Sequence, residues 1–220
     1  MAQRRQFLKL LAAYATGFLA ASFHWISLPE ISWGAVRRLL PKGTDLKSLI
    51  NENPATLDTR NLELQPLNRF GTMGLSDQAT DLKNWRLACT GEVRREIRLD
   101  YDELRRLPAL EKQVLLICPG FFANHGLWKG ISFTELGKQA GLKKGVTHVT
   151  VSGPTGPYEK TFRFPWPEAV SGKVFLAYQV NGVDLPVKHG FPLRLVAEGY
   201  YGYEWVKYVD QVRFEKIDKS

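Results

Sequence analysis

The sequence predicts an α+β fold that is dominated by strands and carries only short helices. Short apolar runs with strand spacing recur along the chain, helical segments with capping signals are few, and no Gly-rich phosphate loop is present. The chain has 220 residues, of which 44% are hydrophobic, so it can bury one sizeable core. We expect an N-terminal leader over residues 1–28, a helical linker over 29–59 and a single domain over 60–218.

Two short helices are predicted before the domain, over residues 31–40 and 44–51. Thr44 is expected to cap the second helix, and Pro54 is expected to stop it. Residues 55–81 contain Pro, Asn, Gly and Asp without a clear period. They predict a long irregular arm, and long ordered loops are often functional.

Two helices inside the domain carry clearer capping signals. Asp100 with Glu103 predicts a short helix that ends at Pro108. The Ser-Phe-Thr-Glu capping box at 132–135 predicts a second helix, which Gly141 ends.

Strand periodicity begins at Trp85, Leu87 and Cys89, which share one face of a strand. The continuous apolar run 114–117 is typical of a strand that is buried on both faces. Asn181 and Gly182 form a hairpin turn signal. Further strands are predicted over residues 97–99, 147–151, 160–164, 174–178, 193–196, 205–209 and 212–214.

The leader has the pattern of an export signal. Arg4-Arg5-Gln6-Phe7-Leu8-Lys9 precedes an uncharged stretch over residues 10–28, and this arrangement resembles the twin-arginine motif. We therefore expect export by the twin-arginine machinery to the periplasm or the outer face of the cytoplasmic membrane. A generic signal anchor is the alternative. Because the stretch is near the minimum of ~20 residues for spanning a bilayer, a removed signal and a retained anchor both stay open.

The charge and cysteine content exclude several classes of protein. The formal net charge is +8, but part of it lies in the leader, and the other Lys and Arg residues are scattered among acidic ones. No duplex-binding stripe and no nucleic-acid partner are expected; local basic sites for an anionic cofactor fit better. Cys89 and Cys118 are the only cysteines, which excludes a multi-bridge scaffold and a CxxC zinc site. One disulfide between them remains open.

Cys118 is the main candidate for chemistry. It ends the buried run and is followed by Pro119-Gly120, so a sharp turn leaves the thiol at the rim of the sheet. A free Cys is also commonly a small buried hydrophobe, and that role is assigned to Cys89 in the middle of its strand. Nothing in the sequence establishes the partnered His that a cysteine protease needs.

Two segments give a specific resemblance. The run Leu115-Leu116-Ile117-Cys118-Pro119-Gly120, with Trp128-Lys129-Gly130 opening a helix, resembles the centre of the sulfite oxidase-type molybdopterin domain. Residues 185–194 and 201–207 are similar to the family's His-Gly-x-Pro-x-Arg and Gly-x-x-x-Val-Lys segments. The resemblance implies a molybdenum-molybdopterin cofactor, with Cys118 as the metal ligand. It also implies cofactor binding by His189, Arg194 and Lys207, with backbone contacts from Trp205 and Val206.

A third segment points to one branch of this family. Residues 68–74 resemble the Asn-x-Phe-x-x-x-Gly segment of the exported methionine-sulfoxide reductase catalytic subunits. The resemblance implies that Asn68, Gly71 and Thr72 line the cofactor, although the branch usually has a Tyr-Glu pair where this chain has Gly71-Thr72. Ser152 lies near the position of a cofactor-contacting Thr of that branch.

The sequence after Cys118 bears on the substrate. Sulfite-oxidising members place an Arg soon after this Cys, whereas residues 107–162 contain no Arg. We expect the loop 121–126 to roof the site, with His125 as a proton donor or as a hydrogen bond donor that stabilises the loop. Arg69 in the irregular arm is the residue that could replace the missing guanidinium.

The predicted function is that of an exported molybdenum oxidoreductase that transfers an oxygen atom to or from a small neutral substrate such as a sulfoxide. The chain has no Cys set for a haem or an iron–sulfur cluster, so we expect a membrane haem protein or a cytochrome as the separate redox partner. A sulfite dehydrogenase is the alternative enzyme. A cofactor-free binding or assembly protein of the same fold is the alternative from another class.

Overall fold

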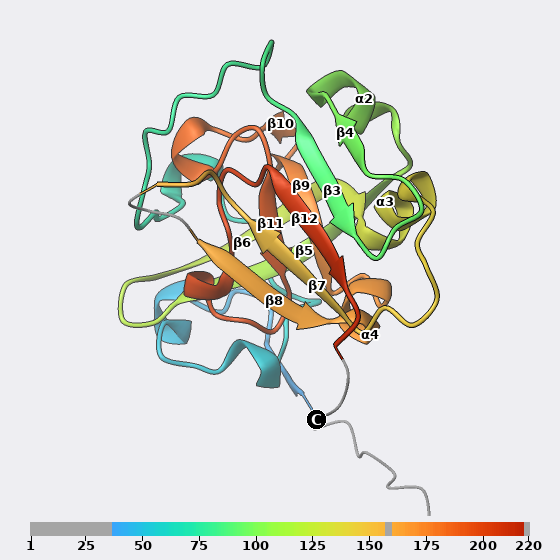
Figure 1. The fold of residues 1–220 in the computed structure, drawn as a ribbon. Helices are drawn as coiled ribbons and strands as arrows, with labels where there is room; N and C mark the ends of the chain where they lie inside the picture. The colour runs from blue at the N-terminus through green and yellow to red at the C-terminus, as the bar shows by residue number, and fades with distance from the viewer. Residues whose placement is uncertain (1–36, 157–159, 218–220) are drawn as a thin grey trace, which may run out of the picture. The chain divides into compact units, whose positions relative to one another are not determined.

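The computed structural model describes residues 37–156 and 160–217, which belong to one compact unit. The predicted strand-rich α+β fold is confirmed: two five-stranded sheets pack together, with short helices at their edges (Figure 1). The predicted leader lies outside the described residues. Within the described ranges, no helix has both the length and the apolar character that crossing a bilayer requires.

The first sheet has the strand order β4-β3-β12-β7-β8. Strands β12 and β3 are parallel, and the other neighbours are antiparallel. Leu87 and Cys89 are fully buried on one face of β3, as their alternation predicted. The strands are β3 (Leu87–Gly91), β4 (Ile97–Leu99), β7 (His148–Ser152), β8 (Thr161–Pro165) and β12 (Gln211–Glu215).

The second sheet has the order β10-β9-β6-β5, and β11 also pairs with β9. Strands β5 and β6 form a long antiparallel hairpin, and β6 shifts register against β9 between Lys129 and Gly130. A Cβ at Gly130 would lie 1.8 Å from the carbonyl oxygen of Leu176, so only glycine fits this close approach. The strands are β5 (Ala109–Cys118), β6 (Phe122–Ser132), β9 (Val174–Val180), β10 (Val183–Asp184) and β11 (Arg194–Ala197).

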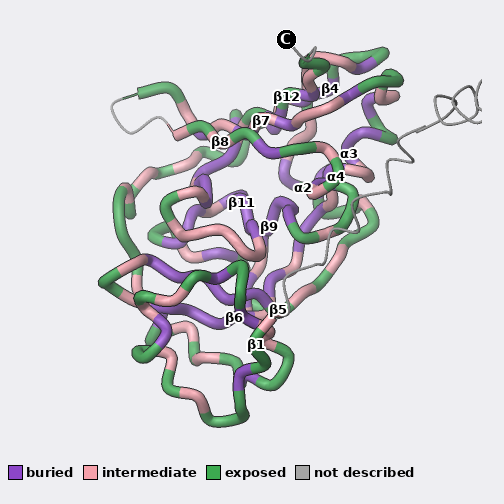
Figure 2. Tube along the Cα trace, turned by 90° about the horizontal axis from the view of Figure 1, so that it is seen from below, coloured by how far each residue is buried: buried purple, intermediate pink, exposed green. Residues whose placement is uncertain are grey.

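The main core lies between the two sheets, and buried residues are concentrated along β5, β6, β9 and β11 (Figure 2). All residues from Val114 to Cys118 are buried, as the continuous apolar run predicted. Cys118 is the last residue of β5, so its predicted place at a strand end is confirmed.

The helices begin at their predicted capping residues. Helix α2 (Tyr101–Arg106) has a reciprocal capping box between Asp100 and Glu103. In α3 (Phe133–Ala140) the Ser132 hydroxyl accepts from the Glu135 backbone N–H, and Gly141 ends the helix in the left-handed region at φ +68°. Helix α4 (Trp166–Val170) follows β8 directly.

The prediction of helices before the domain is wrong for the residues that the structure describes. Residues Arg38–Leu39 form strand β1, which pairs in parallel with β2 (Leu57–Asp58). The second predicted helix is a single 3₁₀ turn, η1 (Leu46–Leu49), which Asp45 caps in place of Thr44. Only Leu49 of this turn is buried, so a longer helix would gain little from packing. Pro54 begins a further 3₁₀ turn, η2 (Pro54–Thr56).

Residues 40–62 pack on the β5–β6 hairpin. Leu40, Leu49, Leu57 and Leu62 form a second hydrophobic cluster with the outward faces of the hairpin, at Leu115, Ile117 and Ala123. This explains why β5 is buried on both faces. The main core covers one face, and the cluster covers the other.

Three further predictions are corrected, two in the hairpin and one near the C-terminus. The expected loop 121–126 is mostly strand, because residues from Phe122 onward pair with β5 after a tight turn. Trp128–Gly130 lie inside β6, and the helix starts three residues later. Residues 205–209 do not form a strand; a 3₁₀ turn, η5 (Gly202–Glu204), precedes an irregular segment that runs to β12. The burial of Trp205, Val206 and Val209 produced the strand-like pattern.

Candidate functional site

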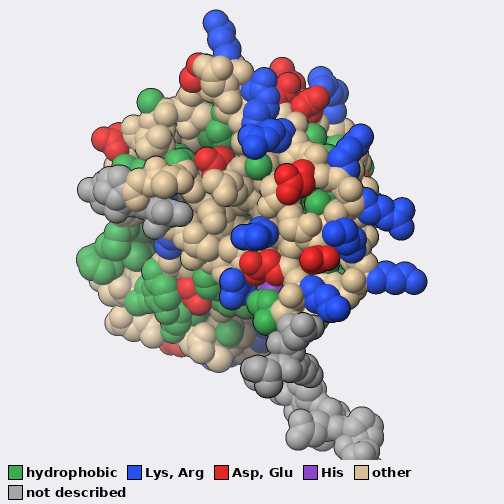
Figure 3. Space-filling model, viewed as in Figure 1, with side chains coloured by type: hydrophobic (Ala, Val, Ile, Leu, Met, Phe, Trp, Pro, Cys, Tyr) green, Lys and Arg blue, Asp and Glu red, His purple; other side chains and the backbone are tan. Residues whose placement is uncertain are grey.

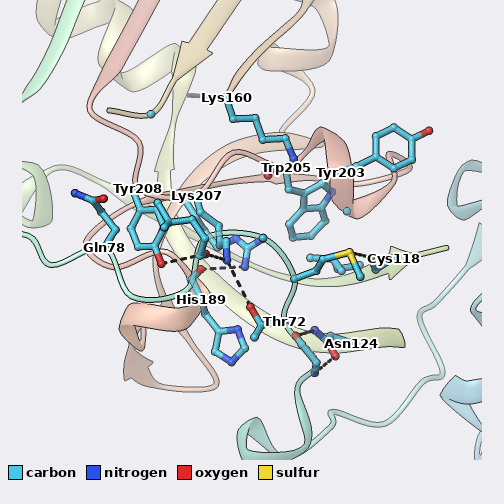
Figure 4. Close-up of a pocket in the computed structure, with 18 of the residues that line it drawn as sticks. Thr72, Gln78, Cys118, Asn124, Lys160, His189, Tyr203, Trp205, Lys207 and Tyr208 are labelled. Carbon is cyan, nitrogen blue, oxygen red and sulfur yellow. Dashed lines mark hydrogen bonds between the residues drawn. The ribbon is translucent and has the colours of Figure 1, made fainter. Parts of the chain in front are cut away.

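A cavity of about 600 Å³ opens at the end of strand β5. Five segments that are far apart in the sequence line it, as Figure 4 shows in part. They are the end of β5 with the start of β6, the irregular arm at 71–78, the turn at 153–156 with Lys160, the segment 189–194, and the segment 202–208. We call this cavity the Cys118 pocket.

Cys118 lies at one end of this pocket. Gly120 takes a left-handed conformation at φ +77°, and the Phe121 N–H donates to the Cys118 carbonyl at 3.0 Å. This tight turn places the thiol at the strand end, where it is 8% exposed. Burial raises the pKa of the thiol, and the nearby Lys160 ammonium opposes that shift. Cys89, in contrast, is fully buried in the core, and burial raises its pKa to about 12. Both described cysteines are free thiols.

The irregular arm forms one wall of the pocket and is held from two directions. The Gly71 backbone exchanges two hydrogen bonds with the Asn124 side chain, each 2.9 Å long. The Thr72 hydroxyl donates to the Lys188 carbonyl at 2.9 Å. Met73 follows these two residues in the sequence. Its sulfur lies 3.7 Å from the Cys118 sulfur.

Three cations line the pocket: Lys160, Arg194 and Lys207. The Arg194 guanidinium lies against two indoles that contact each other edge to face, 5.1 Å from the ring centre of Trp128 and 5.2 Å from that of Trp205. It is 5% exposed and donates to the His189 carbonyl at 3.0 Å. Burial lowers the pKa of Arg194 to about 9, which leaves it charged at neutral pH.

The two lysines differ in their contacts. The Lys207 ammonium donates to the carbonyls of Leu75 and Lys188, so it ties the arm to the segment 202–208. Lys160 makes a longer contact of 3.4 Å with the Trp205 carbonyl (Figure 4). Burial is the largest cause that lowers the pKa of both lysines, to about 8 for Lys207, and the Arg194 charge adds to it.

The charge balance of the pocket favours an anionic group. The described lining residues include three cations and no carboxylate. Two buried nitrogen atoms there, Arg194 Nε and His189 Nε2, have no hydrogen bond partner among the described residues. A buried polar group without a partner costs free energy, so these atoms favour a ligand that pairs with them. Burial lowers the pKa of His189 to about 4, so its ring is neutral and one nitrogen can donate while the other accepts.

Seven of the predicted site residues line the Cys118 pocket. They come from four separate parts of the sequence and are brought together only by the fold: Gly71, Thr72, Cys118, His189, Arg194, Trp205 and Lys207. A single bound group in the pocket could therefore contact all seven residues.

Three predicted cofactor-binding residues are not among those that line the pocket. Asn68 is exposed on the 3₁₀ turn η3 (Leu67–Arg69). The Ser152 hydroxyl pairs with that of Thr161 at 3.0 Å. Val206 is fully buried, and its carbonyl accepts from the Leu195 N–H at 2.8 Å.

His125 is also outside the pocket. Side chains alternate along β6, so Asn124 faces the pocket and His125 faces the opposite side. The His125 ring is fully buried, and its Nδ1 lies 3.0 Å from the Glu63 carbonyl, to which it donates. Burial lowers the pKa of His125. Of the two roles considered, the structural hydrogen bond therefore fits, and proton donation in the pocket does not.

Sequence reasoning missed Lys160 as a pocket residue. Its position between a Gly-Pro-rich turn and a strand was a usable signal, because such a residue lies at a sheet edge. Arg69, which was expected as a source of positive charge, is exposed and lines a different hollow with Lys47 and Phe121.

The rim near Cys118 is apolar. Hydrophobic side chains gather over the β5–β6 turn and η5 on the face that Figure 3 shows, whereas Lys and Arg are interspersed with Asp and Glu elsewhere on that face. Tyr203, which lines the pocket, is 58% exposed, and Phe121, which lines the neighbouring hollow, is 67% exposed. A ligand that enters at this end would meet apolar surface before it meets the cations.

Comparison with known proteins agrees with this arrangement. A family model described as an oxidoreductase molybdopterin-binding domain matches residues 74–220. The chain is 32% identical over 166 residues to the protein-methionine-sulfoxide reductase catalytic subunit MsrP of Gluconobacter oxydans, a match that covers 66% of this chain and 52% of that protein. The chain thus spans about half the length of this relative.

Other relatives differ in size. The uncharacterized oxidoreductase YuiH of Bacillus subtilis is 26% identical over 137 residues, covering 62% of this chain and 68% of that protein. A nitrate reductase [NADH] of Oryza sativa subsp. japonica is 28% identical over 162 residues, covering 60% of this chain and 18% of that protein. Among solved structures, the sulfane dehydrogenase SoxCD of Paracoccus pantotrophus shares the fold, with a TM-score of 0.58 and 22% identity over 67% of this chain and 41% of that chain.

Proposed function

Because the chain belongs to the oxidoreductase molybdopterin-binding domain family, we propose that it is an exported molybdenum enzyme that removes an oxygen atom from a small substrate such as a sulfoxide, or adds one to it. The observation that carries the proposal is the position of Cys118 at one end of a pocket whose described charged residues are all cations. A thiolate is a suitable ligand for a soft metal, and the cations suit an anionic cofactor.

The family assignment gives molybdenum-molybdopterin as the cofactor, and the pocket residues fit it. Cys118 would bind the metal at one end. Arg194, with its unpaired Nε, and the Lys207 ammonium would hold the phosphate of the pterin. His189 would pair with the pterin through its free Nε2. When bound, the cofactor supplies a metal that exchanges two electrons with the substrate.

The remaining pocket residues position these groups. Asn124 fixes the arm through Gly71, and the arm carries Thr72 and Met73 to the pocket. Phe122 packs against Gly71 and limits the access of water at this wall. In this proposal the protein holds the cofactor and shapes the substrate side of the pocket, while no side chain in the pocket acts as the nucleophile.

The relative from Gluconobacter oxydans supports a sulfoxide as the substrate, because its name assigns it to methionine sulfoxide reduction. The apolar side chains of Phe122 and Tyr203, which line the pocket, would contact the carbon groups of such a substrate. The test is a steady-state assay of purified protein with dimethyl sulfoxide and reduced viologen as the electron donor. Reduction in proportion to the molybdenum content supports the proposal, and no reduction at full molybdenum content contradicts it.

Sulfite dehydrogenation is a second candidate, and one observation favours it. Lys160 brings a positive charge to the part of the pocket near Cys118, where the sequence had placed none. An anion such as sulfite needs paired positive charge in a partly desolvated pocket. Assays of the wild type and Lys160→Met with both substrates separate the candidates. Sulfite oxidation that is efficient in the wild type and lost in the variant would select this second function.

A cofactor-free binding or assembly protein is the candidate from another class. Metal and pterin analysis of protein from an export-competent host distinguishes it directly, because a binding protein would contain neither. The two pocket nitrogens that have no partner among the described residues favour a polar ligand, and the cofactor is one.

The redox partner and the export route are part of the same proposal. A membrane haem protein or a cytochrome would exchange electrons with the bound metal, and the twin-arginine machinery would export the folded, loaded protein. Replacing Arg4 and Arg5 together with Lys preserves the charge, so a generic signal anchor would tolerate the change. We expect the doubly substituted protein to stay in the cytoplasm with its cofactor. Normal export of this variant would contradict the twin-arginine route.

A further inference from the structure

Met73 has an unusual place in the Cys118 pocket. Its sulfur lies 3.7 Å from the Cys118 sulfur, and the residue lines the cavity while remaining 46% exposed. It is one of only two methionines in the sequence, and the other is Met1. Met73 is therefore the single thioether in the described part of the chain, and it lies beside the proposed metal ligand.

The backbone on both sides of Met73 is anchored. The hydrogen bonds of Gly71 and Thr72 hold the preceding residues, and the Leu75 carbonyl accepts from Lys207 and from the Tyr208 hydroxyl. Only Gly74, at φ +72°, lies between Met73 and the second anchor. The thioether can change rotamer, but its backbone position next to Cys118 is fixed by contacts with three other segments.

These observations point to a reaction at Met73 itself. We propose that Met73 is an internal substrate of the Cys118 pocket: a peroxide oxidises its thioether to the sulfoxide, and the same site reduces the sulfoxide back. The inference rests on the proposed oxygen-atom removal from sulfoxides. It goes further by assigning a substrate within the chain, so that the sulfoxide and the site that reduces it belong to the same protein molecule.

The two steps balance as follows. In the first, one oxygen atom of hydrogen peroxide forms a bond to the Met73 sulfur, the sulfur loses two electrons, and water is released. In the second, the sulfur–oxygen bond breaks, the sulfur takes up two electrons that reduced viologen supplies, and the oxygen leaves as water with two protons. Exposure allows the first step, and the proximity of Met73 to Cys118 favours the second.

The oxidation step is tested in metal-free protein, where it needs no enzyme activity. Leu39→Met provides a matched site, because Leu39 is 49% exposed and lies outside the pocket, on strand β1. After limited peroxide treatment, peptide masses report the fraction of sulfoxide at positions 73 and 39. We expect both positions to gain one oxygen atom. Failure of Met73 to oxidise while position 39 does so would overturn the inference.

The reduction step is tested in the same Leu39→Met protein loaded with cofactor, oxidised, and then given reduced viologen. We expect the sulfoxide at position 73 to disappear at least about tenfold faster than that at position 39, because proximity replaces a bimolecular encounter. The half-time at position 73 should not change when the protein is diluted. Oxidised Cys118→Ser protein should keep its sulfoxide at position 73.

The outcomes separate this inference from the proposed function. Reduction of added dimethyl sulfoxide with a persistent sulfoxide at position 73 would overturn the inference and leave the function in place. Equal decay at positions 73 and 39, with a dependence on protein concentration, would also overturn it. If neither dimethyl sulfoxide nor position 73 is reduced at full molybdenum and pterin content, the proposed function itself fails.

Discussion

The side-chain amide of Asn124 and the backbone of Gly71 form a two-way pair of hydrogen bonds. The Gly71 N–H donates to Asn124 Oδ1 at 2.9 Å, and Asn124 Nδ2 donates to the Gly71 carbonyl at 2.9 Å. Asn124 is 3% exposed, so solvent competes little for these bonds. The Asn124 amide makes the two hydrogen bonds that the backbone of a neighbouring strand would make. It thereby fixes the irregular arm to strand β6, although Gly71 and Asn124 are 53 residues apart in the sequence.

We predict that Asn124→Asp loosens the arm. A carboxylate accepts but cannot donate, so the Gly71 carbonyl would lose its donor and face a negative charge. The free energy of unfolding should fall by about 1 to 3 kcal/mol, measured by urea denaturation. Proteolysis within residues 71–78 should become faster. Asn61→Asp, at an exposed position, is the control and should change stability by less than about 0.5 kcal/mol. Equal effects of the two substitutions would contradict the role of the amide pair.

Gly71→Ala should disturb the same wall of the pocket. An added Cβ would lie 2.3 Å from Phe122 Cγ, so either the ring or the arm must move. We expect a loss of roughly 1 to 3 kcal/mol of stability, together with lower cofactor content. Phe122→Leu in the same chain should recover part of the loss, because the clash couples the two positions. Gly172→Ala, in open space at φ +71°, should cost about 1 kcal/mol from backbone strain and leave cofactor content unchanged.

The two cysteines should respond differently to substitution. Cys118→Ser should keep the fold and abolish metal-dependent turnover, since the hydroxyl is a poor replacement for a soft thiolate ligand. Cys89→Ala should keep turnover and lose only packing energy, roughly 1 kcal/mol. Metal content, turnover and thermal unfolding of both variants check this prediction. Normal activity with bound molybdenum in the Cys118 variant would show that another group holds the metal.

Lys207→Met should lower cofactor content, because the bound phosphate would lose a charge-assisted hydrogen bond worth about 1.5 to 3 kcal/mol. The variant also loses the contacts of the ammonium with the carbonyls of Leu75 and Lys188. Pterin and molybdenum content per protein molecule are the measurements. Lys188→Met is the matched control, because its side chain is exposed outside the pocket. Unchanged pterin content in Lys207→Met would remove this residue from the proposed cofactor site.

Asp210 should make stability depend on pH. Burial raises its pKa from 3.8 to about 6, and its buried Oδ1 has no hydrogen bond partner in the part of the chain that the structure describes. The folded state therefore favours the protonated form, and this contribution is present below about pH 4 and is lost as the pH rises through about 6.

Asp210→Asn stays neutral, so its advantage over the wild type should be near zero at pH 4. It should grow to about 1 to 2 kcal/mol at pH 8, a figure reduced for the partial exposure of this residue. Denaturant unfolding of both proteins across this range measures the difference. His189 titrates in both proteins and its contribution cancels in the comparison. A difference that does not vary with pH would contradict the raised pKa.

The sequence by itself determined the elements that depend on local chemistry. The caps at Asp100 and Ser132, the hairpin turn at Asn181-Gly182 and the buried run that ends at Cys118 all appear where they were predicted. These features depend on residues that are neighbours in the chain. The resemblance to known motifs then selected seven residues that the fold brings together in one pocket.

Only the tertiary structure decided which side chains meet in that pocket. His125 and Asn124 are adjacent, but the alternation of β6 and its pairing with β5 send them to opposite faces. Lys160 and Met73 join Cys118 from segments 42 and 45 residues away, through contacts that no local pattern encodes. The predictions of helices before the domain are wrong, within the described residues from 37 onward, for the same reason. The apolar residues of this segment are buried against the β5–β6 hairpin, and this non-local burial outweighs the local preference for helix.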